Sequence, residues 1–394
     1  MAYKKNKQQN ELRAYKFRIY PTTQQQTELQ NNFDAVRYLW NRSLALKSFA
    51  YQKFGANIQM STLKKRIVKL NDRHEWLKGA HSQVKQQSII NLDIAFKNFF
   101  NPQLRAKYPQ FKSKRNDQSI QYPQGVKIVD GDKLILPKIG KIRLLMHREM
   151  ESGLIKTVTI KKTKTNKYFA SILVDTGIVK DTPVAKVFVD EILGIDTGLI
   201  DIVTCSDGFK QTNPKFLKKR LKTIKKEQRK LSRKTNKSSK RRAKQKIKLA
   251  KAYEKLTNTR NDFLHKLSTA LVSENQVISV ETLAIKNLMK NKKLSRAFSD
   301  ASIGNLYNML RYKIENKGGH FVKVDRFFAS TKTCHVCNHK VEKMPLNIRE
   351  WACPQCKTIH DRDINAAINI KSEAIKMLRA TGTVVLRRGD TVSL

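Results

Sequence analysis

Residues 355–370 read QCKTIHDRDINAAINI, and this stretch joins a cysteine pair to a cluster of acids and a helix without a linker. Cys356 closes a C-x-x-C pair, and the Asp-Arg-Asp cluster at 361–363 follows after four residues. Ile364 and Ile368 then stand at the spacing of one face of an α-helix. The stretch therefore predicts a metal-binding knuckle that leads directly into carboxylates at the start of a packed helix.

The net charge of the chain is extreme. Its 394 residues include 80 lysines and arginines but 32 aspartates and glutamates, a formal net charge of +48. Self-repulsion of this size does not help folding, so a polyanionic partner is expected, and nucleic acid fits best. An anionic membrane is the alternative, but we find no amphipathic anchor or lipidation signal. Apolar residues make up 40%, enough for packed cores, and the length predicts two to four compact units.

The N-terminus and the cysteines indicate an intracellular protein. Residues 1–17 are polar and lack the apolar region of a signal peptide, and no run of about 18 apolar residues follows. Four of the five cysteines stand in two C-x-x-C pairs, which in a large basic protein indicates metal in a reducing compartment rather than disulfides.

The two C-x-x-C pairs, separated by fifteen residues, predict a structural zinc site. Four thiolates complete the tetrahedral coordination of a zinc ion, so no coordination position is left open for catalysis. His335 and His339 are therefore expected to contact solvent or nucleic acid rather than the metal, and Cys205 is expected to be a small core residue. The predicted zinc ligands are Cys334, Cys337, Cys353 and Cys356.

The first half of the chain predicts a sheet interrupted by helices. Residues 13–20 alternate basic and apolar side chains, as a half-exposed strand does, and amphipathic helices follow to about residue 105. After Pro109 the chain turns to short β-branched runs divided by Gly, Asp and Asn, which is typical of hairpins. We expect the early strand to join them in a β-barrel.

The second half alternates strands and helices. Residues 187–208 predict two strands joined by a tight turn, and 276–281 and 321–325 predict two more. Residues 215–251 are strongly basic, contain one acid, and keep helical spacing except at TNKSS, so they predict two long basic helices in a hairpin.

Three acids stand at the ends of apolar runs. Asp196 follows the buried run 192–195, Glu281 ends the strand 276–281, and Asp363 begins the C-terminal helix. Carboxylates at buried strand ends are costly unless cations pair with them. Two divalent ions would supply this positive charge. They would also hold the attacking and leaving oxygens in line during displacement at a phosphodiester. Together with the basic surface, this predicts phosphodiester hydrolysis.

Asp361 competes with Asp363 for the third ligand position. We prefer Asp363 because the helix face that follows it fits packing against a sheet. Asp361 would then cap that helix.

At these residues the sequence resembles a known family. Three stretches carry the resemblance: GIDTG at 194–198, SVETL at 279–283 and HDRDINAAINI at 360–370. They resemble the three RuvC-like motifs of the transposon-encoded TnpB proteins, which are relatives of the type V (Cas12-type) CRISPR nucleases. The C-x-x-C pairs just before the last stretch resemble the zinc ribbon of these proteins. Further matching pieces include KFRIYPT, VRYLWN, YPQFKSK and RFFASTKTCHVC, in the same order along nearly the whole chain. Asn338 and His339 depart from the Cys-Gly that commonly follows the first zinc pair.

The resemblance implies an α/β multidomain fold, with an RNase H-like RuvC domain that contains an inserted zinc ribbon and follows a β-barrel wedge domain with a helical recognition insertion. The domains implied are the first part of the wedge barrel at 1–28, the helical recognition domain at 29–105, the second part of the wedge at 106–182, the RuvC-like nuclease domain at 183–330 with the basic hairpin at 215–260, the zinc ribbon at 331–358, the RuvC C-terminal helix at 359–377, and a flexible tail at 378–394.

It also implies an activity. Family members bind a guide RNA derived from the transposon end and cleave complementary double-stranded DNA beside a short transposon-adjacent motif, using Mg²⁺. Carried over, Asp196, Glu281 and Asp363 are the catalytic acids that hold two Mg²⁺ ions. We expect a monomer in a ribonucleoprotein, in the cytoplasm of a prokaryote and associated with the nucleoid.

Candidate nucleic-acid contacts fall in three groups. Arg, Tyr, Asn and Gln side chains of the helical block suit base edges or phosphates, and cations of the basic hairpin and near the ribbon suit the backbone of an RNA or heteroduplex. They are Arg37, Tyr38, Asn41, Gln83, Gln86 and Gln87 in the block; Lys218, Arg229, Arg233, Lys234 and Arg241 in the hairpin; and Lys332 and Arg362 near the ribbon.

Other functions stay open on the sequence. A nuclease-inactive RNA-guided repressor or transposition regulator would bind DNA without cutting it, but the presence of all three acids argues against it. A zinc protein that binds RNA alone leaves the acids unexplained. A transposase that also joins strands is a further alternative, because RNase H-like folds can do both.

Overall fold

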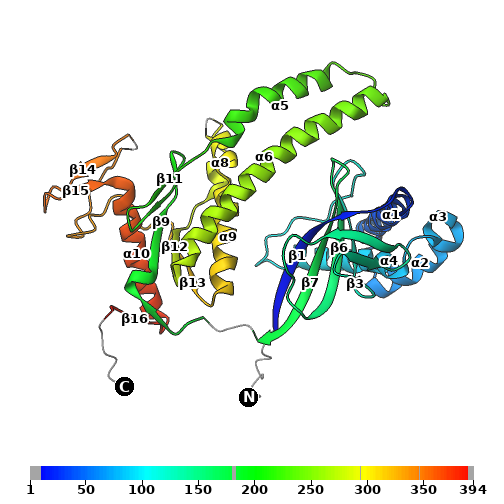
Figure 1. Cartoon of the computed structure of the whole chain (residues 1–394), viewed down its shortest axis with the longest axis horizontal. Helices are drawn as coiled ribbons and strands as arrows, with labels where there is room; N and C mark the ends of the chain where they lie inside the picture. The colour runs from blue at the N-terminus through cyan, green and yellow to red at the C-terminus, as the bar shows by residue number, and fades with distance from the viewer. Residues whose placement is uncertain (1–9, 180–182, 293, 346, 389–394) are drawn as a thin grey trace. The chain divides into compact units, whose positions relative to one another are not determined.

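The computed structural model describes residues 10–179, 183–292, 294–345 and 347–388 (Figure 1). The chain divides into two compact units, Met1–Lys180 and Asp181–Leu394. Within the described residues, no helix combines the length and the apolar character that crossing a membrane requires.

The first unit contains a seven-stranded antiparallel sheet in the order β2-β6-β7-β1-β5-β4-β3. The early strand β1 pairs with β7 on one side and β5 on the other, so it does join the strands that follow residue 109. The inward side chains of this sheet form one hydrophobic core. Strands β2 and β3 are the two edge strands of the sheet. Closure into a barrel stays a prediction. The strands are β1 (Asn10–Tyr20), β2 (Gln118–Tyr122), β3 (Lys127–Val129), β4 (Lys133–Leu136), β5 (Gly140–Leu145), β6 (Leu154–Lys162) and β7 (Tyr168–Val179).

The helical block between β1 and β2 is built on one long helix. The helices are α1 (Thr23–Phe54), α2 (Met60–Arg73), α3 (Glu75–Lys78) and α4 (Ser82–Phe100). Thr22 and Gln25 form a capping box at the start of α1. Leu29 and Phe33 of α1 pack into the core of the sheet, whereas Leu39 packs against α2 and α4. Helix α1 therefore runs through the domain boundary expected at residue 28.

The second unit is organised around a five-stranded sheet in the order β11-β10-β9-β12-β13. Strands β11, β10 and β9 are antiparallel, and β9, β12 and β13 are parallel. The strands are β9 (Ile192–Asp196), β10 (Asp201–Cys205), β11 (Lys210–Thr212), β12 (Val277–Glu281) and β13 (His320–Val324). The helices are α5 (Phe216–Ser232), α6 (Lys240–Ser273), α7 (Ile285–Leu288), α8 (Ser295–Ala301), α9 (Ile303–Asn316) and α10 (Arg362–Ala380), with a 3-10 turn at Val189–Glu191.

Helices α5 and α6 form the basic hairpin that the sequence predicts, and the chain turns between Ser232 and Lys240 (Figure 1). Ile224 is the buried residue of α5, so most of that helix is open to solvent. The C-terminal part of α6 packs into the sheet core through Leu264, Leu267 and Leu271. The fold thus anchors one end of a long cationic hairpin and leaves the rest available to a partner.

The region expected as a flexible tail from residue 378 needs correction. Helix α10 continues to Ala380, and β16 (Val384–Leu386) pairs in parallel with β8 (Lys186–Phe188). Leu378 and Val385 are buried in one apolar cluster with Val187, and this burial holds the segment in place. Residues 389–394 of the expected tail lie outside the described residues.

Candidate carboxylate site and cysteine metal centre

Two of the three predicted acids lie at adjacent strand ends. Strands β9 and β12 are parallel, with Ile195 opposite Val280, so the next residues of the two strands are Asp196 and Glu281. Neighbouring strands lie about 4.8 Å apart. The sheet therefore brings these two carboxylates, 85 residues apart in sequence, to one edge.

Helix α10 carries the third acid to the same region. Asp363 is in its first turn. The helix crosses β9 in close contact at Gly194, where an added Cβ would stand 2.1 Å from the carbonyl oxygen of Ala367. Because Gly194 is two residues before Asp196, this crossing fixes the start of α10 relative to the end of β9.

The pKa of Asp196 also indicates that the three acids lie near one another. Its side chain still reaches solvent, but protein atoms crowd it closely. Burial is the main cause that raises the pKa of Asp196 to about 7, and the negative charges of Glu281 and Asp363 raise it further. A hydrogen bond from the Thr197 backbone and the charge of Arg362 act in the opposite direction. The three acids thus form one electrostatically coupled cluster with too little positive charge to balance Asp196.

Asp363 has two cationic partners of its own. Its carboxylate lies 2.8 Å from Arg349 and 3.3 Å from Arg362. The three carboxylates are not among the described groups whose ligand atoms all lie within 4.8 Å of one another. Two arginines therefore neutralise the charge of Asp363, a role that the sequence analysis assigned to metal ions.

Side chains that sequence reasoning did not identify support the cluster. Ser330 donates to Glu281 Oε1 at 2.7 Å, and Thr197 shares a 2.8 Å hydrogen bond with Tyr307. Burial is the main cause that raises the pKa of Tyr307, so this phenol stays neutral. Ser330 lies in the RFFAST stretch just before the first cysteine, a position whose composition alone signals nothing.

Asp361 caps α10. Its Oδ1 accepts hydrogen bonds from the backbone N–H groups of Asp363 at 3.0 Å and Ile364 at 2.9 Å, and Lys210 lies 2.6 Å from its Oδ2. This is the capping role that the sequence offered for Asp361. Asp363 is the better candidate ligand, because its charge and that of Glu281, rather than the charge of Asp361, raise the pKa of Asp196.

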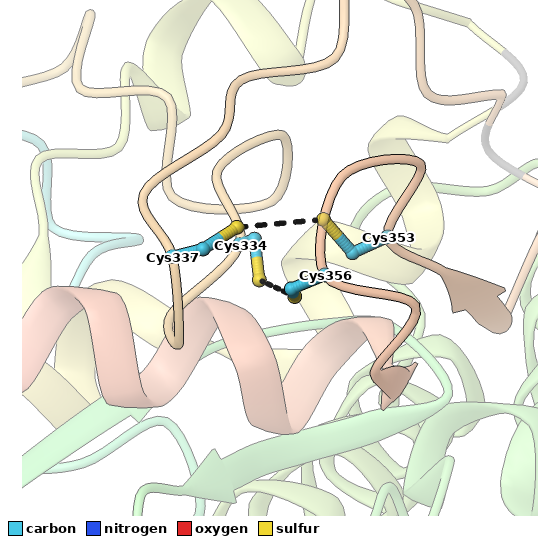
Figure 2. Close-up of side chains that lie close together, drawn as sticks. All are labelled: Cys334, Cys337, Cys353 and Cys356. Carbon is cyan, nitrogen blue, oxygen red and sulfur yellow. Dashed lines mark hydrogen bonds between the residues drawn. The ribbon is translucent and has the colours of Figure 1, made fainter.

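The four predicted cysteines gather at one point, with their side chains turned toward a common centre (Figure 2). Their sulfurs all lie within 4.8 Å of one another, and the Cys334–Cys356 and Cys337–Cys353 pairs are each 3.6 Å apart. A Zn–S bond of about 2.3 Å puts tetrahedral sulfurs about 3.8 Å apart. The donor set and its spacing fit zinc, so this group can bind the ion.

The two halves of the cysteine centre have the same backbone turn. Asn338 donates to the carbonyl of Cys334 at 3.0 Å, and Lys357 donates to the carbonyl of Cys353 at 2.9 Å. Both Asn338 and Lys357 have a φ of 61°, in the left-handed region that favours glycine. The departure from Cys-Gly noted in the sequence is thus tolerable, because asparagine adopts this conformation more readily than most residues.

The centre is fastened to α10 by two asparagines one turn apart. Asn365 accepts from the His335 backbone N–H at 3.0 Å and donates to the Thr333 carbonyl at 2.8 Å. Asn369 donates to the carbonyls of Ser330 at 2.8 Å and Thr333 at 2.6 Å. The cysteine centre and the acid cluster therefore share α10 and the segment around Ser330.

Removing one thiolate should empty the centre. We expect Cys334→Ser to lose bound zinc and to speed hydrogen–deuterium exchange of residues 333–361, because four cysteines and few apolar side chains hold this segment together. Metal analysis and exchange mass spectrometry measure both effects. Cys205→Ala is the matched control, since Cys205 is buried in β10 outside the centre. Full zinc content in Cys334→Ser would contradict the assignment.

Four of the six predicted contacts in the helical block have partners within the fold. Arg37 pairs with Asp34 at 2.6 Å, and the Tyr38 hydroxyl lies 3.0 Å from His74 Nε2. Asn41 both donates to and accepts from the backbone of Lys112, at 2.9 and 2.7 Å. On α4, Gln87 donates to Asn91 at 2.9 Å, Gln83 is half-buried and Gln86 is exposed. Asn41 thus serves the fold, because both ends of its amide are used internally.

The predicted contacts in the second unit divide by exposure. Lys218, Arg229, Arg233 and Arg241 are exposed on the basic hairpin, and Lys234 is half-buried. Lys332 is half-buried and donates to the Glu342 carbonyl at 2.8 Å. Arg362 was expected to contact nucleic acid, but its side chain is buried and donates to Asp363 and to the Pro345 carbonyl at 3.2 Å.

The chain matches known families over most of its length. Residues 176–292 match a family described as "Probable transposase", and residues 304–370 match "Cas12f1-like, TNB domain". Residues 11–56 match a family described as "Helix-turn-helix domain", although here they form β1 and a single continuous helix. The chain also resembles the cryo-EM structure of a Cas12f1–sgRNA–target DNA complex, with a TM-score of 0.54 at 13% identity over 92% of this chain and 99% of that one. That likeness shows a shared fold.

Two relatives match nearly end to end. A Streptomyces pristinaespiralis protein named "Putative RNA-guided DNA endonuclease" is 37% identical, covering 91% of this chain and 88% of the relative. The Escherichia coli protein named "Putative RNA-guided DNA endonuclease InsQ" is 30% identical, covering 97% and 95%. With this identity over almost the full length, the chain belongs to the TnpB family, which is related to the Cas12 proteins.

Proposed function

We propose that the protein is an RNA-guided DNA endonuclease that cleaves double-stranded DNA complementary to a guide RNA, next to a short transposon-adjacent motif. The observation that supports this most is the coupled cluster of Asp196, Glu281 and Asp363 at the end of β9 and β12. The names of the two nearly full-length relatives point to the same activity.

The five-stranded sheet would be the RNase H-like, RuvC-like core of the nuclease. Its three antiparallel strands are followed by two parallel ones, and α10 packs across β9. Ligands of open α/β sheets bind outside the carboxyl ends of the parallel strands. Asp196 and Glu281 stand at those ends, which is where a substrate would be expected.

The donor set suits magnesium. Carboxylate oxygens are the ligands Mg²⁺ prefers, and the raised pKa of Asp196 marks a place where negative charge lacks a full complement of cations. Asp196, Glu281 and Asp363 would hold two ions, and the bound metal would stabilise the charge that develops on the phosphodiester. The four-cysteine centre would be the structural zinc ribbon.

The residues around the acids would position them. Ser330 orients Glu281 through its 2.7 Å hydrogen bond, and Asp361 fixes the first turn of α10 that carries Asp363. Arg349 and Arg362 neutralise the negative charge of Asp363. A metal ion bound at Asp363 would have to replace at least one of these guanidinium contacts, because Arg349 and Arg362 lie 2.8 and 3.3 Å from its two oxygens.

The basic hairpin of α5 and α6 would hold the backbone of the guide RNA or of the RNA–DNA heteroduplex. Lys218, Arg229, Arg233 and Arg241 are exposed along it, and Glu227, the one acid of residues 215–251, accepts a hydrogen bond from Gln245 at 2.7 Å. Such contacts recognise the charge and A-form shape of the helix, while base pairing supplies sequence specificity. The protein would act as a monomer within the ribonucleoprotein.

A nuclease-inactive RNA-guided repressor or transposition regulator is the second candidate. The pairing of Asp363 with Arg349 and Arg362 favours it, because both arginines neutralise the third acid without a metal. This function would keep guide and DNA binding and lose cleavage.

The test is reconstitution. The protein is purified with its copurifying RNA, the RNA is sequenced, and DNA carrying a matched target within a library of flanking sequences is added with Mg²⁺. We expect cutting of matched DNA beside one short flanking motif, and none without Mg²⁺ or with a mismatched target. Binding without cutting under all flanking sequences would favour the repressor, and absence of a defined RNA would overturn both.

A further inference from the structure

The segment around Phe111 is fastened to α1 on both sides of the aromatic ring. Trp40 Nε1 donates to the Gln110 carbonyl at 2.9 Å. Asn41 exchanges two hydrogen bonds with the backbone of Lys112, and the Lys112 ammonium lies 3.8 Å from the centre of the Trp40 indole ring. The backbone that carries Phe111 is therefore held by its two neighbours.

Phe111 itself is 63% exposed. A single exposed apolar side chain is ordinary in a folded protein. Here, however, the bonds of Trp40 and Asn41 hold the backbone on both sides of Phe111, and the ring of Phe111 remains largely exposed. This arrangement suits a ring that contacts a partner.

Phe111 is also one wall of a surface cavity of about 320 Å³. Phe33 and Val36 supply apolar lining from α1, and both belong to the core of the sheet. Asn116 and Ser119 line the cavity with an amide and a hydroxyl, groups that can pair with the edges of a base. The cavity thus combines an aromatic face, a firm apolar lining and polar groups.

The charges around the cavity favour an anionic strand. Its acid Asp117 is paired with Lys161 at 3.0 Å. The nearby Asp34 is shared by Arg37 at 2.6 Å and Lys114 at 3.4 Å. Two acids therefore face four cations, which are Arg37, Lys112, Lys114 and Lys161, so the charge balance around the cavity is positive.

From these features we infer that the cavity between α1 and residues 110–119 receives one unpaired nucleobase of the bound nucleic acid, stacked on Phe111, with its phosphates near Lys112 and Lys114. The inference rests on the proposed function for its partner and adds a base-binding site to it. Stacking on an aromatic ring needs no particular base, so the site would recognise an unpaired nucleotide rather than a sequence.

Photocrosslinking tests the site directly on the full chain. The probes are short oligo(U) and oligo(dT) strands with a central 5-iodouracil, either single or annealed to a complement. We expect the single strands to crosslink at Phe111, in the tryptic peptide of residues 108–112, and the annealed strands not to. The stronger of the two single-stranded signals identifies the site as one for RNA or for DNA.

The affinity of substituted proteins for single strands measures how much the stacked base contributes to binding. At salt high enough to weaken phosphate contacts, Phe111→Ala should lower affinity for the single strand by roughly 5- to 150-fold, the value of one stacked base. Phe111→Tyr should restore binding, and Phe111→Leu, which keeps apolar bulk without a stacking face, should not. Phe54→Ala is the matched control, since Phe54 is 67% exposed on the same unit but does not line this cavity.

Crosslinking elsewhere, equal crosslinking of single and annealed strands, or the same affinity for Phe111→Ala and Phe54→Ala would overturn the inference. These outcomes are separable from failure of the proposed function. A protein that cuts matched DNA without a Phe111 crosslink loses the base site alone, whereas one that crosslinks at Phe111 but never cuts keeps the site and loses the nuclease.

Discussion

Asp196→Asn is expected to abolish cleavage of matched DNA while leaving guide RNA and target binding unchanged. The asparagine keeps the shape of the side chain but removes the charge that, in the proposed function, would hold Mg²⁺ at the end of β9. Loss of one member of a catalytic unit costs on the order of a thousand-fold or more in rate. Single-turnover cleavage and a gel-shift assay on the same preparations measure the two effects.

The same substitution should make the magnesium-free protein more stable. The pKa of Asp196 lies near 7, above its ordinary value of 3.8, so the folded state retains a proton that the unfolded chain has released between these values. Stability is therefore lost as the pH rises through this window, and the charged Asp196 destabilises the fold above it. Removing the charge should raise stability by roughly 1–3 kcal/mol at about pH 8, less than the full shift because the side chain reaches solvent, and should change little at about pH 4.

Thermal unfolding of zinc-loaded protein, with and without Mg²⁺, provides the readout. Mg²⁺ should raise the unfolding temperature of the wild type and not of Asp196→Asn. Asp190→Asn is the matched control, because Asp190 is an acid of the same unit with a 65% exposed side chain. If Asp196→Asn cuts DNA like the wild type, or if Mg²⁺ raises its unfolding temperature as much as that of the wild type, Asp196 is not a metal-binding acid. Melting below the wild type at every pH would instead contradict a destabilising charge at Asp196.

The patterns that could be interpreted from sequence were local or periodic. The cysteine spacing predicted a centre whose four sulfurs do lie within 4.8 Å. Asp196 and Glu281 could be identified because each ends an apolar run, and the parallel pairing of β9 with β12 makes them neighbours.

Features that depend on long-range contacts could not be predicted in this way. Arg362 resembles any other cation in a basic chain, and only the fold shows it buried against Asp363. Asn41 carries the groups of a base reader, but the loop at Lys112 uses them both. The run at 384–386 is too short to indicate a strand, and it becomes one because β8 offers a partner edge.

Gly194→Ala should damage both the fold of the second unit and cleavage, although it adds a single methyl group. The new Cβ would stand 2.1 Å from the Ala367 carbonyl oxygen and 2.7 Å from the Lys371 backbone nitrogen. Both atoms belong to the backbone of α10, so no side chain can rotate away. Helix α10 has to separate from β9, and overpacking of this kind costs about 1–3 kcal/mol or more.

The cost to cleavage should exceed the cost to stability, because α10 carries Asp363 and β9 carries Asp196. A displacement of about 1 Å between reacting groups can lower a rate about a hundred-fold. Thermal unfolding, hydrogen–deuterium exchange of α10 and single-turnover cleavage measure the two losses. Gly79→Ala is the control, since its Cβ would be too close only to the amide end of Asn31 at 2.9 Å, which can turn aside, and would make ordinary van der Waals contact with the Trp76 carbonyl oxygen at 3.7 Å.

The two glycines therefore separate a general effect of glycine replacement from a loss of contact between β9 and α10. If Gly194→Ala melts and cuts like Gly79→Ala, the close crossing of α10 over β9 is absent. The third acid would then have no fixed position relative to the other two, and three carboxylates from distant parts of the chain could not share a metal site.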